Sequence, residues 1–201
     1  MTEPESATPR RRPGGRTARN REMVIDAAMS LLVEVQYDGL NMDAVAERAG
    51  VHRATVYRRW RDVGGLLADV FDAATDDEWA PADTGSLLGD LTAINREVYE
   101  ALDAETSVTR ALINASFQSP QAAAALREFW RDRYRRCEVV IDRAVARGEV
   151  PEGTDAHRVV VAATAPIYHR LVLLREPPDP AVVDDAARDA VAAARAQMVS
   201  R

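Results

Sequence analysis

Apolar residues recur at helical spacing along most of the chain. In the clearest stretch, from about Ala18 to Val35, they follow the order i, i+3, i+4, i+7, i+8 and i+11, which places them on one face of a helix. These positions are Val24, Ala27, Ala28, Leu31, Leu32 and Val35. No stretch alternates apolar and polar residues for long enough to indicate a sheet. The pattern therefore predicts an all-α protein.

Capping and turn residues divide this pattern into about nine helices. Gly50 permits a tight turn after the second helix, Gly148 is placed to cap the long seventh helix, and Pro151 prevents that helix from continuing. Prolines in the segment 176–180 separate the last two helices. We also expect Pro166 to kink its helix. The predicted helices span about 18–35, 42–49, 53–60, 62–74, 87–102, 105–117, 121–147, 155–174 and 180–199.

The segment 40–67 has the layout of a helix-turn-helix. Two short predicted helices flank a turn that contains Gly50, and in such a motif the second helix enters the major groove of DNA. Val51, Val56 and Trp60 are spaced to face inward and hold this helix in place. Its outward side combines the small Ala54 with donors suited to phosphates and guanine edges: His52, Arg53, Thr55, Tyr57, Arg58 and Arg59. The alternative interpretation is an ordinary helical hairpin with a solvated basic face, in which His52 is only an exposed cap.

This segment resembles a known family. Residues 21–67 are similar to the DNA-binding domain of the TetR (tetracycline repressor) family, and the later helices agree with that family in number and length. The matching pieces are Ala27-Ala28, Leu31-Leu32, Leu40-Asn41-Met42, Ala49-Gly50-Val51 and the Thr-Val-Tyr-Arg-Arg-Trp run at 55–60. The resemblance implies a three-helix DNA-binding domain at residues 17–62 and a helical ligand-sensing and dimerisation domain at residues 63–201.

The resemblance also implies roles for single residues. It places Thr55 and Tyr57 at phosphate or groove contacts, and Arg53, Ala54 and Arg59 at positions that often face bases. Asn41 begins the helix whose N-terminus points at a phosphate, where free amides and the helix dipole favour an anion.

Two positions depart from the family pattern. His52 stands where the family usually has serine, and Val63 stands where it usually has a phosphate-binding lysine. Either Arg61 replaces that lysine or one phosphate contact is missing.

The charge distribution agrees with DNA binding at one end only. The net charge is −6, and all 26 basic residues are arginine. Residues 1–61 hold 11 arginines and 8 acidic residues, whereas the remainder holds 15 arginines and 24 acidic residues. Residues 1–16 are predicted to be a disordered basic arm. The cluster Arg10, Arg11, Arg12, Arg16, Arg19 and Arg21 either binds DNA weakly, in the minor groove or along phosphates, or is a solvated tail.

The last two predicted helices are candidates for a dimer interface. Residues 159–168 carry no charge, so this helix has no evident water-facing side and needs cover from several directions. The expected dimer contacts are Val160, Ala163, Ile167, Leu171, Val183, Ala187, Ala190 and Ala194. The alternative is that these helices form a purely intramolecular core. The resemblance implies a four-helix dimer interface, which would set two recognition helices about 34–36 Å apart on a palindrome.

A ligand pocket is expected among the middle helices, where aromatic residues mix with a few polar groups. The candidate lining residues are Tyr99, Arg110, Asn114, Phe117, Phe129, Trp130, Tyr134, Tyr168 and His169. Aromatic residues at helical spacing are also typical of plain core, so each of them has that second interpretation.

The sequence offers no enzyme motif. It has no glycine-rich phosphate loop, no His-Glu-x-x-His and no metal-ligand pair, so we expect no catalysis, cofactor or metal. The three histidines are far apart, and the single Cys137 is expected to be a buried apolar residue in a reducing cytoplasm. No export signal or membrane segment is expected, because no long apolar stretch occurs.

Together these observations predict a ligand-responsive transcriptional regulator. We expect a repressor that binds a palindromic operator in double-stranded DNA as a homodimer. A small molecule releases it by shifting the fourth helix. The alternative is a helical small-molecule-binding or protein-interaction protein without operator-specific DNA binding.

Overall fold

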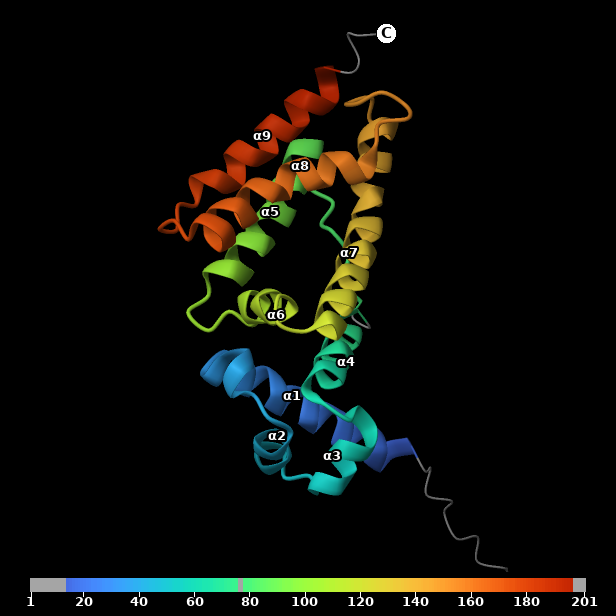
Figure 1. The fold of residues 1–201 in the computed structure, drawn as a ribbon. Helices are drawn as coiled ribbons and strands as arrows, with labels where there is room; N and C mark the ends of the chain where they lie inside the picture. Colours follow the sequence, from blue (N-terminus) through green and yellow to red (C-terminus); the bar gives the residue numbers. More distant parts are fainter. Residues whose placement is uncertain (1–13, 76–77, 197–201) are drawn as a thin grey trace, which may run out of the picture.

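The computed structural model describes residues 14–75 and 78–196 of the chain, and within these ranges every regular element is helical. The all-α prediction is therefore confirmed. Figure 1 shows the elements as α1 (Gly14–Gly39), α2 (Met42–Ala49), α3 (Arg53–Trp60), α4 (Val63–Thr75), α5 (Leu87–Asp103), α6 (Val108–Ser116), α7 (Pro120–Ala146), α8 (Ala156–Tyr168), the π-helical turn η1 (His169–Leu174) and α9 (Ala181–Ala196). None of the described helices is long and apolar enough to cross a membrane.

Most helix boundaries follow from local capping. Helices α2 and α3 have the predicted limits. Helix α6 starts three residues later than expected, because the Ser107 hydroxyl accepts a hydrogen bond from the Arg110 amide (3.1 Å) and caps the helix there. Helix α1 begins at Gly14 and is interrupted at Gln36, whose φ of 58° and ψ of 179° are not helical. Arg10, Arg11 and Arg12 of the predicted arm lie outside the described residues.

Pro166 does not break its helix at the proline itself. Helix α8 continues past Pro166 to Tyr168, and the irregularity follows as the π-helical turn η1. A proline removes one backbone donor and its ring crowds the preceding turn, so the helix has to readjust nearby. The helix therefore changes to a wider helical turn that begins at His169, three residues after the proline.

The molecule has a small head and a larger body. Helices α1 to α3 form the head at the lower end of Figure 1, and α5 to α9 form the body above it. Helix α4 joins them, and its four buried apolar residues are Leu66, Leu67, Val70 and Phe71. They belong to one core cluster that contains residues of the head together with Ala111 of α6 and Ala122 of α7.

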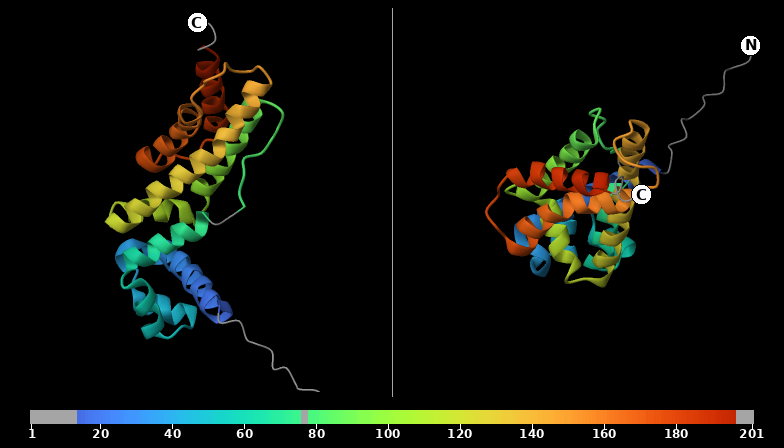
Figure 2. Two further views of the ribbon diagram at one scale, coloured as in Figure 1. Left: turned by 90° about the vertical axis from the view of Figure 1, so that its right-hand side faces the viewer. Right: turned by 90° about the horizontal axis from the view of Figure 1, so that it is seen from above.

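A connector between α4 and α5 runs along one side of α7 (Figure 2). Arginines of α7 hold its backbone. Arg136 donates to the Trp79 carbonyl oxygen (3.2 Å), and Arg143 donates to the Ala82 carbonyl oxygen (3.1 Å). Trp79 is therefore fixed beside α7, although it lies in a segment without regular structure.

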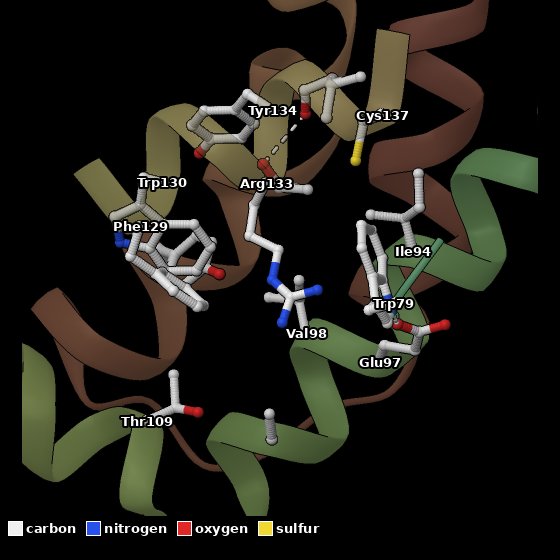
Figure 3. Close-up of a pocket in the computed structure, with 14 residues that line it drawn as sticks. Trp79, Ile94, Glu97, Val98, Thr109, Phe129, Trp130, Arg133, Tyr134 and Cys137 are labelled. Carbon is white, nitrogen blue, oxygen red and sulfur yellow. Dashed lines mark hydrogen bonds between the residues drawn. The ribbon is translucent and has the colours of Figure 1, made fainter. Parts of the chain in front are cut away.

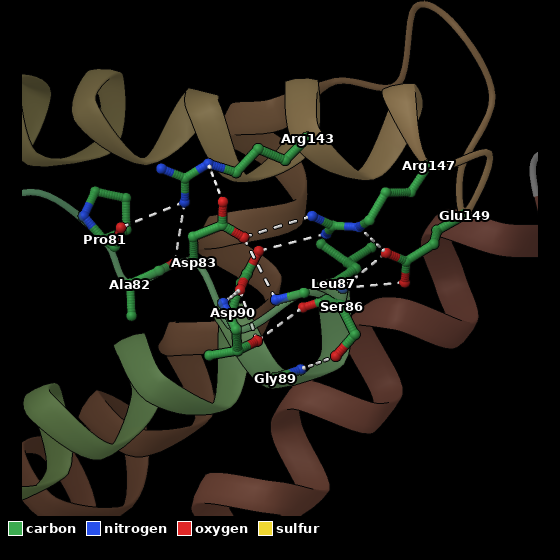
Figure 4. A network of polar contacts seen from close by, with 12 residues as sticks. Pro81, Ala82, Asp83, Ser86, Leu87, Gly89, Asp90, Arg143, Arg147 and Glu149 are labelled. Carbon is green, nitrogen blue, oxygen red and sulfur yellow. Dashed lines mark hydrogen bonds and ion pairs between the residues drawn. The ribbon is translucent and has the colours of Figure 1, made fainter.

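The end of this connector is closed by a buried carboxylate (Figure 4). Asp90 is fully buried and accepts hydrogen bonds from the Thr84 amide and the Thr84 hydroxyl, both at 2.7 Å. The Arg147 guanidinium lies 3.4 Å from the same Asp90 carboxylate. It also pairs with the Glu149 carboxylate at 2.6 Å. Glu149 in turn accepts the Leu87 amide (3.0 Å) at the start of α5. Burial by itself raises the pKa of Glu149, but the bonds from Arg147 and the Leu87 amide outweigh it and lower that pKa.

We expect Asp90→Ala to destabilise the protein by about 2–3 kcal/mol, because buried donors lose their acceptor. The exposed Asp142 on α7 provides a matched control, and Asp142→Ala should change stability by less than about 0.5 kcal/mol. Urea unfolding followed by circular dichroism measures both. Equal effects of the two substitutions would contradict this role of Asp90.

Candidate DNA-binding surface and ligand cavity

The head holds α2 and α3 at a fixed angle through caps and buried side chains. The Asn41 carboxamide oxygen accepts the Ala44 amide (2.8 Å) and caps α2. Gly50 ends α2 in the left-handed region (φ 62°), which suits glycine because it has no Cβ. Val56 and Trp60 are buried under α3, as the sequence predicts, and Val51 packs against the same core.

The outward side of α3 lies at the end of the molecule, away from the body (Figure 1). The exposed residues at or beside α3 are His52, Arg53, Ala54, Tyr57, Arg58, Arg59 and Arg61, and Thr55 is half-buried. His52 occupies the N-cap position, but its side chain makes no capping hydrogen bond. All of these predicted contact residues except Asn41 thus gather on or next to one short helix, and Asn41 begins the helix before it.

Two of these arginines pair with acidic residues of α2 and α4. Arg53 pairs with Asp43 of α2 at 3.2 Å. Arg59 lies 3.4 Å from Asp69 of α4, and its guanidinium stands 5.3 Å from the centroid of the Trp60 ring. Arg59 is thus directed toward α4, whereas the sequence favoured a base contact for it.

A groove of about 480 Å³ separates the start of α1 from α3. Arg16, Asn20, Thr55 and Arg58 are among its lining residues. Cations and hydrogen-bond donors on facing helices are suited to a phosphate group. Of the predicted arginine cluster, Arg16 and Arg21 both line this groove, and Arg21 also binds an acidic residue of α4.

Arg21 and the recognition helix meet at Asp69, a residue that the sequence analysis did not identify. The Asp69 carboxylate accepts hydrogen bonds from the Arg21 guanidinium (2.6 Å) and from the Trp60 indole N–H (2.8 Å). Burial by itself raises the pKa of Asp69, but the bonds from Arg21 and Trp60 outweigh it and lower that pKa. Helices α1, α3 and α4 are thus joined through one carboxylate.

The body contains a cavity of about 260 Å³ between α5, α6, α7 and α8, with the connector at its edge. Figure 3 shows several of its side chains converging on this space. The cavity is lined by Trp79, Ile94, Glu97, Val98, Ala101, Thr109, Phe129, Trp130, Arg133, Tyr134, Cys137, Val160, Thr164 and Tyr168. Apolar and aromatic groups dominate this lining, and a few polar groups converge in it, as in small-molecule sites.

Polar groups in the cavity have defined partners. The Trp79 indole N–H donates to the Glu97 carboxylate (2.7 Å), and the Thr164 hydroxyl donates to the Val160 carbonyl oxygen (3.0 Å). Burial raises the pKa of the Tyr168 hydroxyl, and it raises the pKa of the Cys137 thiol to about 11. Both groups are therefore neutral at neutral pH, and Cys137 is buried as the sequence predicts.

Comparisons with known proteins agree with this architecture. Residues 24–70 match the family model described as bacterial regulatory proteins, tetR family, and residues 81–190 match the model described as tetracyclin repressor-like, C-terminal domain. The HTH-type transcriptional regulator AqdR of Rhodococcus erythropolis is 37% identical over 164 residues, which cover 80% of this chain and 77% of AqdR. The chain belongs to the TetR family of transcriptional regulators.

Further comparisons show similarity in sequence or in fold to this TetR-family regulator. The DNA-binding transcriptional repressor TetR of Mycobacteroides abscessus is 31% identical over 157 residues, or 75% of this chain and 80% of that protein. The solved structure of the TetR family transcription regulator SCO0332 has a TM-score of 0.67 at 26% identity, covering 86% of this chain and 97% of that one. The FadR regulator of Bacillus subtilis, solved with stearoyl-CoA, has a TM-score of 0.63 at 14% identity, covering 85% and 97%. These relatives are transcriptional regulators, a class that is generally not enzymatic.

The TetR-family cavity contains only part of the predicted ligand site. Phe129, Trp130, Tyr134 and Tyr168 line it. The other five candidates lie elsewhere, because helical spacing does not show which side of a helix meets a cavity. Tyr99 is buried in a separate cluster, Arg110 and Asn114 line another cavity of about 420 Å³, Phe117 is 75% exposed, and His169 is exposed. Arg133 also lines the cavity, but the sequence prediction did not include it. It follows Phe129 by four residues and Trp130 by three, so helical spacing places it on the same side of the helix as these two rings.

The eight expected dimer contacts are enclosed within the single subunit. Val160, Ala163, Ile167, Leu171, Val183, Ala187, Ala190 and Ala194 are each at most 8% exposed within the single subunit. Their side chains pack against α5, α7 and one another, so contacts within the subunit already cover most of their surface. The charge-free run has no polar residue that marks the outer side of α8, so the sequence does not distinguish the outer side from the inner one. The exposed side of α8 carries Ala162 and Ala165, and Leu173 is exposed on η1.

We expect Asp69→Asn to lower the free energy of unfolding at pH 7 by about 1–3 kcal/mol. Because folding lowers the pKa of Asp69, its contribution is present above the ordinary value of 3.8 and is lost as the pH falls through the lowered value. The difference from the wild type should therefore shrink in acid, which urea unfolding at a series of pH values measures. Asp72→Asn on the exposed side of α4 is the control, and an equal effect there would argue against the Asp69 junction.

Proposed function

We propose that this TetR-family regulator is a repressor that binds a palindromic operator as a homodimer and is released by a small molecule. The observation that carries the proposal is that α4 contacts both the recognition helix and the wall of the ligand cavity. The protein would act in the cytoplasm, where the chromosome is accessible. The M. abscessus relative, described as a DNA-binding transcriptional repressor, supports repression as the mode of action.

The operator contacts are proposed at the exposed side of the head. Arg53, Ala54, Tyr57 and Arg58 of α3 face the major groove, with Thr55, His52 and Asn41 beside the phosphates. The groove between α1 and α3 adds Arg16 to the phosphate contacts. Arg59 serves mainly to position α3 because it pairs with Asp69, and Arg61 lies exposed where a phosphate contact next to Val63 is expected.

The partner subunit is proposed to cover the outward side of α8. Val161, Ala162 and Ala165 recur at helical spacing there, and the run from Val159 to Tyr168 has no charged residue. An uncharged helix face that remains exposed in the monomer is suited to a helix of a second copy. Small side chains allow the two helices to approach closely. A two-fold dimer then presents two copies of α3 to one side of the duplex.

Release is proposed to pass through α4. Phe71 of α4 packs against Phe129 of the cavity wall, with ring centroids 6.1 Å apart. Two residues earlier in α4, Asp69 holds Trp60 at the end of the recognition helix. A ligand that displaces Phe129 therefore moves the helix that carries Asp69, and the separation of the two recognition helices changes. The FadR complex with stearoyl-CoA supports a small-molecule effector for the body domain of this fold.

Sequencing the genomic DNA fragments that the purified protein retains tests operator recognition. We expect a palindrome, bound at least about 1,000-fold more tightly than a scrambled duplex in fluorescence anisotropy at moderate salt. Arg58→Ala should weaken operator binding about tenfold. It should also reduce the slope of log affinity against log salt concentration by about one, because one phosphate contact is lost. Arg131→Ala, on the exposed side of α7, is the control and should bind as the wild type does. Equal affinity for operator and scrambled DNA would refute the proposed function.

We expect Ala165→Arg to yield monomers in analytical ultracentrifugation, because it places a charge in the uncharged α8 face. Operator affinity should fall by more than about tenfold, since one head then binds alone. Ala146→Arg, at an exposed position near the end of α7, should remain dimeric. A dimeric Ala165→Arg variant with normal operator binding would show that the subunits meet elsewhere.

A further inference from the structure

Aromatic rings surround the ligand cavity on several sides. Trp130 lies nearly parallel to Tyr134, with ring centroids 6.0 Å apart and planes inclined by 28°. Tyr168 and Phe129 both meet the Trp130 ring edge to face, with ring centroids 5.3 Å and 5.0 Å from it. Faces and edges arranged in this way favour another flat ring, which can stack or pack edge-on against them.

The size of the cavity limits the ligand further. Its volume is about 260 Å³. An apolar cavity of about 150 Å³ takes a single benzene ring. The cavity therefore has room for about two fused rings and lies just below the usual range of pockets for drug-sized ligands.

Arg133 brings a positive charge to the centre of this aromatic space (Figure 3). Its guanidinium carbon lies 4.5 Å from the centroid of the Trp79 ring and 5.2 Å from that of Phe129. Among the lining residues that the structure describes, the one carboxylate belongs to Glu97, which is exposed and accepts a hydrogen bond from the Trp79 indole N–H. Burial raises the pKa of Tyr134 and of Tyr168, so these phenols contribute no negative charge. A guanidinium only donates hydrogen bonds, so at this place between two rings it is suited to an acceptor or an anionic group of a ligand.

We propose that the effector is a flat, two-ring aromatic acid whose anionic group binds the Arg133 guanidinium between Trp79 and Phe129. This inference rests on the proposed function, because it names the ligand class of the same cavity. Arg133 also donates to the Ala74 carbonyl oxygen in the last turn of α4 (3.3 Å). The ligand's anion thus competes for the cation that holds the end of α4, and this competition links binding to operator release.

Four probes separate the features of this ligand class on the wild-type full chain. 2-Naphthoate has both rings and the charge, naphthalene-2-methanol has the rings without the charge, benzoate has one ring, and decanoate is a flexible acid. We expect 2-naphthoate to bind at least about tenfold more tightly than naphthalene-2-methanol in isothermal titration at pH 7, as a charge-assisted hydrogen bond requires. It should also bind more tightly than the other two acids.

Substitution of Arg133 then tests the source of the preference. Arg133→Met removes the charge and keeps most of the side-chain length, so the affinity for 2-naphthoate should fall to that for naphthalene-2-methanol, which itself should change little. Arg131→Met is the matched control on the same helix, since Arg131 has a 68% exposed side chain and pairs with Glu128. That variant should keep the full preference for the acid.

Three other outcomes would overturn the proposed ligand class. Equal binding of acid and alcohol by the wild type, absence of binding of all four probes, or a preference that survives in a folded Arg133→Met variant overturns the ligand class. If circular dichroism shows that Arg133→Met is unfolded, the four-probe comparison on the wild type decides alone. Operator binding is measured in parallel without probe. Intact operator binding with no selectivity refutes only the ligand class, whereas missing operator binding refutes the proposed function.

Discussion

Helix α4 has to bury its apolar side chains against the head and the body at once, and the arrangement of the molecule depends on this constraint. Leu66 and Leu67 are fully buried and Phe71 is 2% exposed, in a cluster that unites the head with α6 and the start of α7. Burial of each such side chain contributes about 1.5–3 kcal/mol. Because protein interiors are closely packed, α4 cannot shift against one body without disturbing its contacts with the other. The head and the body are therefore mechanically coupled even though they have separate tasks.

Polar contacts attach α4 at two further points. Asp69 links its middle to α1 and to the end of the recognition helix, and Arg133 of α7 donates to the Ala74 carbonyl oxygen near its C-terminus. A cation is favourable at that end, because the last carbonyl oxygens of a helix carry partial negative charge. Hydrogen bonds have a narrow range of favourable geometry, so a small displacement weakens them more than it weakens apolar contacts. Under the proposed function, these hydrogen bonds are the contacts of α4 that a ligand in the cavity would weaken first.

Charge alone does not identify the DNA-binding surface of this protein, because several of its arginines bind groups of the protein itself. Arg136 and Arg143 of α7 bind carbonyl oxygens of the connector, and Arg147 meets the buried Asp90. Arg21 belongs to the basic N-terminal cluster, yet its guanidinium is held by Asp69. An arginine fork donates in several directions, which suits backbone carbonyl oxygens as well as phosphates. Which partner it meets depends on the neighbouring helices rather than on its own position in the sequence.

The amino-acid sequence by itself determined the helices, the turn at Gly50, and the inward residues Val56 and Trp60. These features depend on periodicity and capping within a few residues, so they are legible without knowledge of the rest of the chain. The family resemblance of residues 21–67 has the same local origin, and the family matches confirm it.

Only the tertiary structure decided which side of each helix faces which neighbour. Val160 was expected at the dimer interface but is buried in the subunit, because an uncharged helix carries no polar marker for its outer side. Asp69 lies 48 residues from Arg21 in the chain, and Arg133 lies 59 residues from Ala74. No local pattern encodes such pairings, since they exist only when separate helices have packed together.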